Sequence, residues 1–381
     1  MKSFEQFNRY LIAAIVCVLA SPISAEQSAD YIPKPGEFPP AGAGQYLAGE
    51  LVSVDHVNRR GALRLVGENS EDQYHSAPSH PFAMLPFGTL RYHGAPAELR
   101  DIPIGTMLHG YFLLPPEGDT KIIVPNEGAK FVSKYTHALS VEDDFSFYKR
   151  REQSWKIVSI DREKGQLKAV LTGPAADDGL NGEKTFEIDR STRVWRAREF
   201  GKLEDLAAEQ AVQINLTWGS DWQNGLHQIA DVWIDDESCT ISTERQRQIH
   251  LRYQRTHWLA GWVDHVEHQP GGAGIVTLTL FGGMDPTLYE TVRAKGGGEA
   301  IAAAEWTLRS FWQNHDNKYG SILDVKDSPS PPMGSSGLQV RFQVAELLEG
   351  FRPGRIIRFR PNGFSNVKLP PEERVQGMND R

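Results

Sequence analysis

Apolar and polar residues alternate with a period of two along many short stretches of this chain. Residues 156–160 and 277–280 show the pattern, and turns rich in glycine bound such stretches. Successive side chains of a β-strand point to opposite faces, so the alternation predicts strands that each bury one face. Short strands with glycine turns at this spacing favour sandwiches or small closed barrels. We therefore expect a mainly β protein.

The strand pattern recurs three times along the chain. The first strand of each copy reaches an acidic residue, and Asp55, Asp161 and Glu267 are equally spaced (161 − 55 = 106 and 267 − 161 = 106). A turn and a second strand follow each of them. Self-similarity at a fixed period indicates repeated structural units, and units of about 100 residues match the usual domain size.

The back halves of the three copies also correspond. In each copy a short helical turn or loop leads into a closing strand, and Gly105 and Gly354 stand before that strand in the first and third copies. Glycine permits a positive φ. The second copy has Glu209 near this place, so we expect its turn to differ.

The sequence predicts few helices. Residues 242–256 form one candidate, which links the second unit to the third. Asp285 is a good N-cap with Pro286 at the first helical position, which predicts a helix over residues 287–295. A further helical turn is expected over residues 299–306.

These patterns divide the chain into seven segments. In order, they are a signal peptide (1–25), a linker rich in Pro and Gly that forms an extended arm (26–46), barrel-like unit 1 (47–152), barrel-like unit 2 (153–240), a linking helix (241–258), barrel-like unit 3 with a helical insertion and a low-complexity loop (259–364), and a polar tail (365–381).

One family resemblance rests on these motifs. The pattern of a "Gly-x-Val-x-x-Val-Asp" strand, a glycine turn, a second strand and a later "Leu-x-Asp-Leu-x-x-Gly" segment resembles the tandem OB-like β-barrel domains of secreted bacterial proteins of unknown function. The resemblance covers about 300 residues in three copies. It implies three tandem small OB-like β-barrel units with a few short helices, and it carries over no catalytic residue.

The first 25 residues have the organisation of a signal peptide. Lys2 and Arg9 precede an apolar run over residues 10–20, and Ala25 ends an acceptable cleavage site. A permanent membrane-spanning helix needs about 20 apolar residues, more than this run provides. The bulky Val16 before Cys17 argues against a lipoprotein signal. We predict an exported protein, periplasmic or secreted, with a retained N-terminal anchor as the alternative.

The net charge bears on the class of partner, and the cysteine content bears on disulfides and thiol reactivity. The formal net charge is −8, and nucleic-acid binders need a basic surface that releases counterions from phosphates. Nucleic acid is therefore a disfavoured partner. Once Cys17 leaves with the signal peptide, Cys239 is alone and no internal disulfide can form. We expect Cys239 to be a buried or inert thiol, because its acidic neighbours raise the pKa.

Aromatic residues supply the best candidate surface. All nine tryptophans fall between residues 155 and 312, and Trp218 and Trp222 flank a hairpin loop that is predicted to lift Trp222 into solvent. Flat indole rings stack on sugars or bases, and OB-like barrels bind oligosaccharides or oligonucleotides. The competing interpretation is that these tryptophans fill barrel interiors or staple their own hairpin.

We find no catalytic motif, no converging set of metal ligands and no cofactor fingerprint. The interpretation that follows is a non-enzymatic structural or binding protein of the cell envelope, with an envelope polysaccharide or a protein as partner and Trp218 and Trp222 as ligand-binding residues. The first alternative is an envelope polysaccharide hydrolase. The second is single-stranded nucleic-acid binding through the OB-like barrels.

Overall fold

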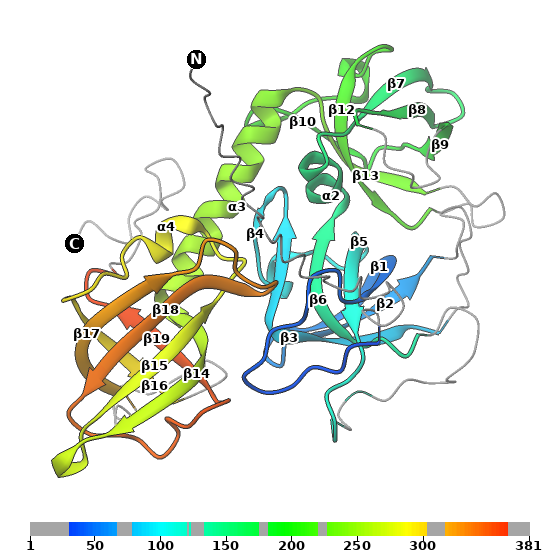
Figure 1. The fold of residues 1–381 in the computed structure, drawn as a ribbon. Helices are drawn as coiled ribbons and strands as arrows, with labels where there is room; N and C mark the ends of the chain where they lie inside the picture. Colours follow the sequence, from blue (N-terminus) through cyan, green and yellow to red (C-terminus); the bar gives the residue numbers. More distant parts are fainter. Residues whose placement is uncertain are drawn as a thin grey trace, which may run out of the picture.

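Three small closed β-barrels follow one another along the chain (Figure 1). They are seen in a computed structural model that describes residues 30–66, 78–119, 122, 133–174, 182–219, 227–302 and 317–364. The predicted signal peptide and polar tail lie outside the described residues. The predicted mainly β fold with three tandem barrels is confirmed.

Barrel 1 is a closed sheet of five strands. The strands are β1 (Gln45–Asp55), β2 (Arg60–Leu65), β3 (His80–Tyr92), β5 (Met107–Leu113) and β6 (His137–Asp143), and a short β4 (Ala95–Pro96) pairs with the end of β3. The cyclic order is β1-β2-β3-β6-β5, in which only the β3–β6 pairing is parallel. Leu51, Phe82 and Phe112 are fully buried in its core.

Barrel 2 repeats this connectivity. Its strands are β7 (Ser154–Asp161), β8 (Gln166–Thr172), β9 (Glu183–Glu187), β12 (Ala211–Thr217) and β13 (Gln228–Trp233), and the hairpin of β10 (Arg193–Arg196) and β11 (Glu199–Phe200) adds to the edge of β13. The cyclic order is β7-β8-β9-β13-β12, again closed by one parallel pairing, β9 with β13. Both barrels have the five-stranded form of OB-like folds.

Barrel 3 closes differently. It has six strands, all paired antiparallel: β14 (Leu259–His268), β15 (Gly274–Phe281), β16 (Gly297–Ile301), β17 (Asn317–Asp327), β18 (Ser335–Val344) and β19 (Ile356–Pro361). Residues 299–301, expected in a helical turn, belong to β16, because their backbone pairs with both β17 and β19. The predicted helix after Asp285 exists but is short, α4 (Pro286–Tyr289), and the Asp285 side chain accepts from Thr287 N as its cap.

The first strand of each barrel carries a bulge at the same place in the repeat. Register shifts follow Leu51 in β1, Ile157 in β7 and Val263 in β14, which are spaced by the same interval as the three acidic residues of the sequence repeat. An extra residue in one strand bends it and increases its twist, which helps a short sheet to close into a barrel. The period seen in the sequence is therefore a period of backbone geometry.

A residue with positive φ stands before the closing strand of each barrel. Its N–H donates to the carbonyl oxygen of the residue before the bulge, in the pairs Gly105 (98°) to Leu51, Glu209 (69°) to Ile157 and Gly354 (75°) to Val263, each 2.8 Å long. The expectation that Glu209 makes a different turn is therefore wrong. Glu209 adopts the left-handed conformation of the two glycines, which costs a residue with a Cβ about 1–2 kcal/mol, because its bond to β7 holds it there.

The linking helix is longer than predicted. It is α3 (Asp236–His257), of 22 residues, whereas the sequence predicted a start at residue 242. The Asp235 carboxylate accepts a hydrogen bond from Ser238 N at 2.7 Å, so the capping residue lies well before the predicted start. The other α-helix with more than one turn among the described residues is α2 (Asp144–Arg150), between barrels 1 and 2.

Helix α3 runs diagonally across the molecule and contacts the other units (Figure 1). Gln254 on α3 donates to Glu98 of barrel 1 at 2.9 Å, and Arg247 pairs with Asp285 beside barrel 3 at 2.5 Å. At the first turn of α3, Cys239 packs against the second barrel in a small buried cluster that includes Trp233. The helix therefore contacts all three barrels, each of which is a separate sheet.

An apolar seam joins barrels 1 and 3. Phe87 on β3 points away from the core of barrel 1, and its ring centroid lies 6.3 Å from that of Trp262 on β14 and 6.1 Å from that of Phe281 on β15. Phe38 lies 5.4 Å from Phe87 in the same cluster. Residues 30–44, within the segment predicted as a linker, are irregular, and three of them, Tyr31, Phe38 and Ala43, belong to this apolar cluster.

Candidate binding surface at the seam between barrels 1 and 2

Most tryptophan side chains among the described residues are buried. Trp155 and Trp233 are fully buried, and Trp258 and Trp262 are nearly so. Trp218 follows β12 in the predicted hairpin and is 7% exposed. These rings contribute to cores and seams, in line with the competing interpretation raised from the sequence.

Trp218 lies between the first two barrels. The Arg64 guanidinium of barrel 1 stands over its ring at 5.0 Å, and His227 contacts it edge-on with centroids 6.2 Å apart. Arg64 also pairs with Glu50 at 3.2 Å. Trp222 lies outside the described residues. The assignment of Trp218 and Trp222 as ligand-binding residues stays a prediction, and Trp218 has one ring face under Arg64 and little exposed surface.

Two exposed tyrosines form an aromatic surface on barrel 1. Tyr46 on β1 and Tyr111 on β5 stand directly opposite each other in the antiparallel ladder. Their side chains share one face of the sheet, with ring centroids 5.8 Å apart at 61°. Tyr46 is 39% exposed and Tyr111 37% exposed. We call these two residues the tyrosine pair.

A chain of hydrogen bonds holds Tyr46 in place. The Tyr46 hydroxyl lies 2.6 Å from His109 Nδ1, and His109 Nε2 lies 2.8 Å from Asp144 Oδ1. Asp144 also accepts from Leu216 N of barrel 2 at 2.8 Å. With Nε2–H donated to the carboxylate, Nδ1 is left to accept the phenol proton. An exposed ring is thus tied to a buried carboxylate at the seam.

Ring stacking completes this support. The His109 ring stacks on Phe147 of α2 with centroids 3.9 Å apart, and the Arg151 guanidinium lies 3.4 Å from the Phe147 centroid. The aspartate that begins α2 is the hydrogen-bonding Asp144. The position of α2 between the barrels therefore fixes both the histidine and the tyrosine beyond it.

The contact between barrels 1 and 2 is built around two buried carboxylates, Asp143 and Asp144, and we call it the polar seam. Asp143 lies at its centre. It is fully buried and caps α2 by accepting from Ser146 N at 3.0 Å, while His93 N and Asn215 Nδ2 donate to it at 3.1 and 2.8 Å. Burial raises the pKa of Asp143 to about 6, against the lowering effect of these hydrogen bonds. Asp143 accepts hydrogen bonds from both barrel 1 and barrel 2, so protonation of its carboxyl group changes contacts that join the two barrels.

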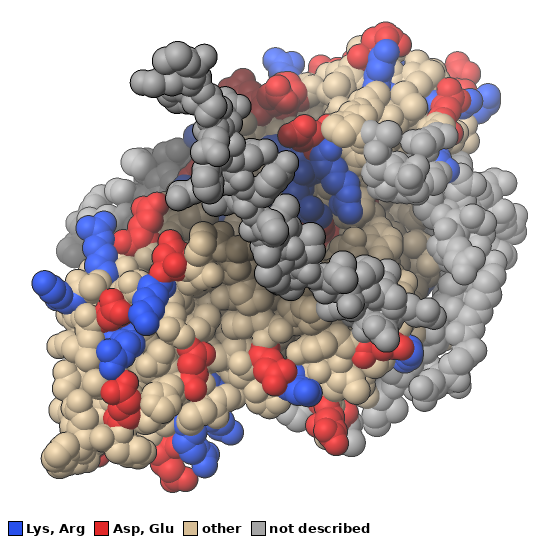
Figure 2. All heavy atoms as spheres, in the orientation of Figure 1, with Lys and Arg blue, Asp and Glu red and all other residues tan. Residues whose placement is uncertain are grey.

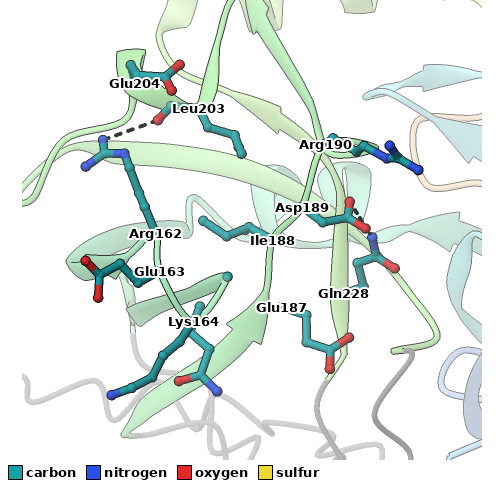
Figure 3. Close-up of a pocket in the computed structure, with 12 residues that line it drawn as sticks. Arg162, Glu163, Lys164, Glu187, Ile188, Asp189, Arg190, Leu203, Glu204 and Gln228 are labelled. Carbon is teal, nitrogen blue, oxygen red and sulfur yellow. Dashed lines mark hydrogen bonds between the residues drawn. The ribbon is translucent and has the colours of Figure 1, made fainter.

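A cavity of about 620 Å³ opens at one end of barrel 2 (Figure 3). Arg162 reaches across to donate to the carbonyl oxygens of Leu203 and Leu206 at 3.4 and 3.1 Å. Asp189 accepts from Gln228 at 3.0 Å, and the Ser191 hydroxyl lowers the pKa of this aspartate. The charged groups Arg162 and Asp189 in the wall are thus held by the protein itself.

Two further candidates from the sequence can be located. Cys239 is buried, and this burial raises the pKa of its thiol to about 12, with Asp236 and Asp235 adding to the effect and Lys149 opposing it. The predicted acidic neighbours thus have the predicted direction, but burial is the larger cause. Among the residues that the structure describes, no three His, Cys, Asp or Glu side chains come together as a metal site.

The fold and this surface define a class: a mainly β protein of three tandem small barrels, the first two five-stranded and OB-like, with an exposed aromatic surface on the first. No protein-family model matches the chain, and no curated protein is significantly similar to it in sequence. In the described part of the chain no helix is both long and apolar enough to cross a membrane.

Proposed function

We propose that this protein is a non-enzymatic binding or structural module of the cell envelope, exported by its N-terminal signal. The observation that carries the proposal is the arrangement of the three barrels, which an apolar seam, a polar seam and α3 join to one another. Tandem units held together can engage a repeating polymer at several points, because the first contact raises the effective concentration for the next.

The test is a pull-down of purified residues 26–381 against insoluble peptidoglycan, chitin, cellulose and immobilised single-stranded DNA, at low and high salt. We expect retention on an envelope polymer that salt does not abolish, because neutral hydrogen bonding and stacking are weakly screened. No retention on any of these materials would overturn polymer binding and leave a structural role or a protein partner as the remaining alternatives.

Single-stranded nucleic acid is the second candidate. On the face drawn in Figure 2, acidic and basic side chains are interspersed over barrel 3, while Lys and Arg side chains gather in the hollow between the barrels. A local basic group of this kind supports binding of phosphates, although the net charge of −8 opposes it. Retention on DNA that collapses at high salt would favour this candidate over the first.

The hydrolase alternative has one supporting feature, the raised pKa of Asp143, which is the property of a general acid. Asp143 is fully buried, so a substrate would reach it only if the seam opened. Release of soluble sugars from whichever glycan retains the protein, abolished in Asp143→Asn but not in the exposed Asp161→Asn, would establish the hydrolase.

A further inference from the structure

We propose that the tyrosine pair, Tyr46 and Tyr111, is a binding site for a pyranose-based glycan. The inference rests on the proposed function and names the ligand class and the surface. Sugar rings have an apolar C–H face that packs on exposed aromatic rings, and tyrosine presents such a ring with a polar tip. OB-like barrels are known to bind oligosaccharides.

The first argument is that Tyr46 is preorganised. Its hydroxyl is hydrogen-bonded to His109, which Asp144 orients from the buried side. Its ring also contacts Phe147, with centroids 6.1 Å apart. A ring that is already fixed loses little side-chain entropy when a ligand stacks on it, so more of the contact energy appears as affinity.

The second argument is the polar group beside the rings. Arg150 of α2 donates to both oxygens of Glu142, through Nε at 3.2 Å and Nη2 at 2.5 Å. Glu142 on β6 stands directly opposite His109 of β5 in the antiparallel ladder, so its side chain lies on the same face of the sheet as Tyr111, two residues further along β5. A fixed, planar arginine–glutamate pair offers donors and acceptors suited to sugar hydroxyls.

The charge of this surface selects among polymers. The Arg150 and Glu142 charges cancel, those of the neighbouring Arg151 and Asp144 are also opposite, and Tyr46 and Tyr111 are uncharged, so this group of residues carries no net charge to attract phosphates. A polyanion gains most of its affinity from counterion release, which a neutral surface does not provide. The geometry therefore suits a neutral polyhydroxyl chain better than a nucleic acid.

The chain offers a matched control for this surface. Tyr319 on β17 of barrel 3 is 70% exposed, more than either member of the pair. Replacing it removes an exposed tyrosine of the same type from another barrel. His109→Gln tests the support of Tyr46 separately, because it removes the bond from Nδ1 to the phenol while leaving the ring of Tyr46 present.

The experiment measures retention of residues 26–381 on peptidoglycan, chitin and cellulose, and then affinity for soluble fragments of the glycan that retains the protein. We expect Tyr46→Ala and Tyr111→Ala each to weaken affinity about tenfold, from the loss of one stacked ring. His109→Gln is expected to weaken it less, and Tyr319→Ala not at all. Circular dichroism and thermal unfolding verify that each variant is folded.

Three results would overturn the inference in distinguishable ways. Undiminished affinity in folded Tyr46→Ala and Tyr111→Ala, with loss in Trp222→Ala, would move the glycan site to the hairpin of barrel 2 and leave the proposed function standing. No retention of the unmodified protein on any glycan would overturn both. Equal losses in Tyr319→Ala and Tyr46→Ala would also overturn the inference, because the contact would not be specific to the pair.

Discussion

The two seams of this molecule hold barrel 1 by opposite means. Toward barrel 3 the seam is apolar, with Phe87, Trp262 and Phe281 in contact. Toward barrel 2 the centre of the seam is polar, with Asp143 and Asp144 accepting hydrogen bonds from both barrels, and only its margin is apolar, where Met107 of β5 packs on the core of barrel 2. An apolar seam is stabilised by area removed from water, whereas a polar one is stable only if each buried group keeps its partners. The two seams therefore respond differently to truncation and to pH.

The largest expected effect is at the apolar seam. Phe87→Ala removes a ring that is almost fully buried between Phe38, Trp262 and Phe281. We expect the free energy of unfolding to fall by about 3–5 kcal/mol, as for other buried Phe→Ala changes. Denaturant unfolding followed by tryptophan fluorescence measures it.

The matched control for this change is Tyr319→Ala, an exposed aromatic outside both seams, for which we expect a change within about 0.5 kcal/mol. A loss in Phe87→Ala no larger than that of this control would mean that the barrels are not held by the apolar contact.

The polar seam is expected to depend on pH through Asp143. Its pKa is raised to about 6 in the folded protein, above the ordinary value of 3.8, so the folded state takes up a proton that the unfolded state lacks between these values. Stability from this group therefore rises as pH falls from above 6 toward 4, by about 3 kcal/mol in all, at about 1.4 kcal/mol per pKa unit. The comparison of unmodified protein with Asp143→Asn across this range isolates the effect.

Asp161 is expected to change the stability with pH in the opposite direction. The backbone N–H of Lys164 lowers the pKa of this exposed carboxyl group, so its contribution is present above pH 4 and is lost as pH falls. Asp161→Asn should therefore not flatten the rise that Asp143→Asn abolishes. If Asp143→Asn and the unmodified protein had parallel stability profiles between pH 4 and 7, the seam would not be sensing this proton.

A smaller effect is expected at Gly105, which lies at the edge of the polar seam. Gly105 has a positive φ, and a Cβ there would lie 3.2 Å from Thr217 Oγ1 of barrel 2. We expect Gly105→Ala to cost about 1–2 kcal/mol. Thermal unfolding should show it as a fall in Tm.

The reciprocal change in barrel 2 is Glu209→Gly, which relieves the same backbone conformation but gives up an exposed ion pair with Lys156. We expect a change within about 1 kcal/mol, because the two contributions oppose each other. A large loss in Glu209→Gly would show that its side chain, and not its backbone, makes the turn.

The sequence predicted the barrels because their cores obey the period of two. Strand β7 alternates as expected in its first half, and the interval of the sequence repeat coincides with the spacing of the bulges at Leu51, Ile157 and Val263. The capping residue Asp285 also acts locally, so a short-range pattern was sufficient to predict it. Each of these features depends on neighbours in the chain.

The seams could not be predicted in this way. In β3, Phe82 faces the core of barrel 1 and Phe87 faces barrel 3, so the strand is apolar on both faces and its outward residues look like core residues. The tyrosine pair was missed for a related reason. A prediction based on tryptophan finds nothing in barrel 1, because all nine tryptophans lie at residue 155 or later. Tyr46 and Tyr111 come together only through the pairing of β1 with β5, two strands that are not neighbours in the sequence.

The central claim, that the seams hold the three barrels in one fixed arrangement, is tested most directly by a distance measurement between barrels 2 and 3. Spin labels at Val158→Cys on β7 and Leu323→Cys on β17, both exposed positions, in a Cys239→Ser background of residues 26–381, report that distance. A single narrow distance distribution, broadened by Phe87→Ala, is the predicted result. A broad or multiple distribution in the protein with intact seams would contradict the claim.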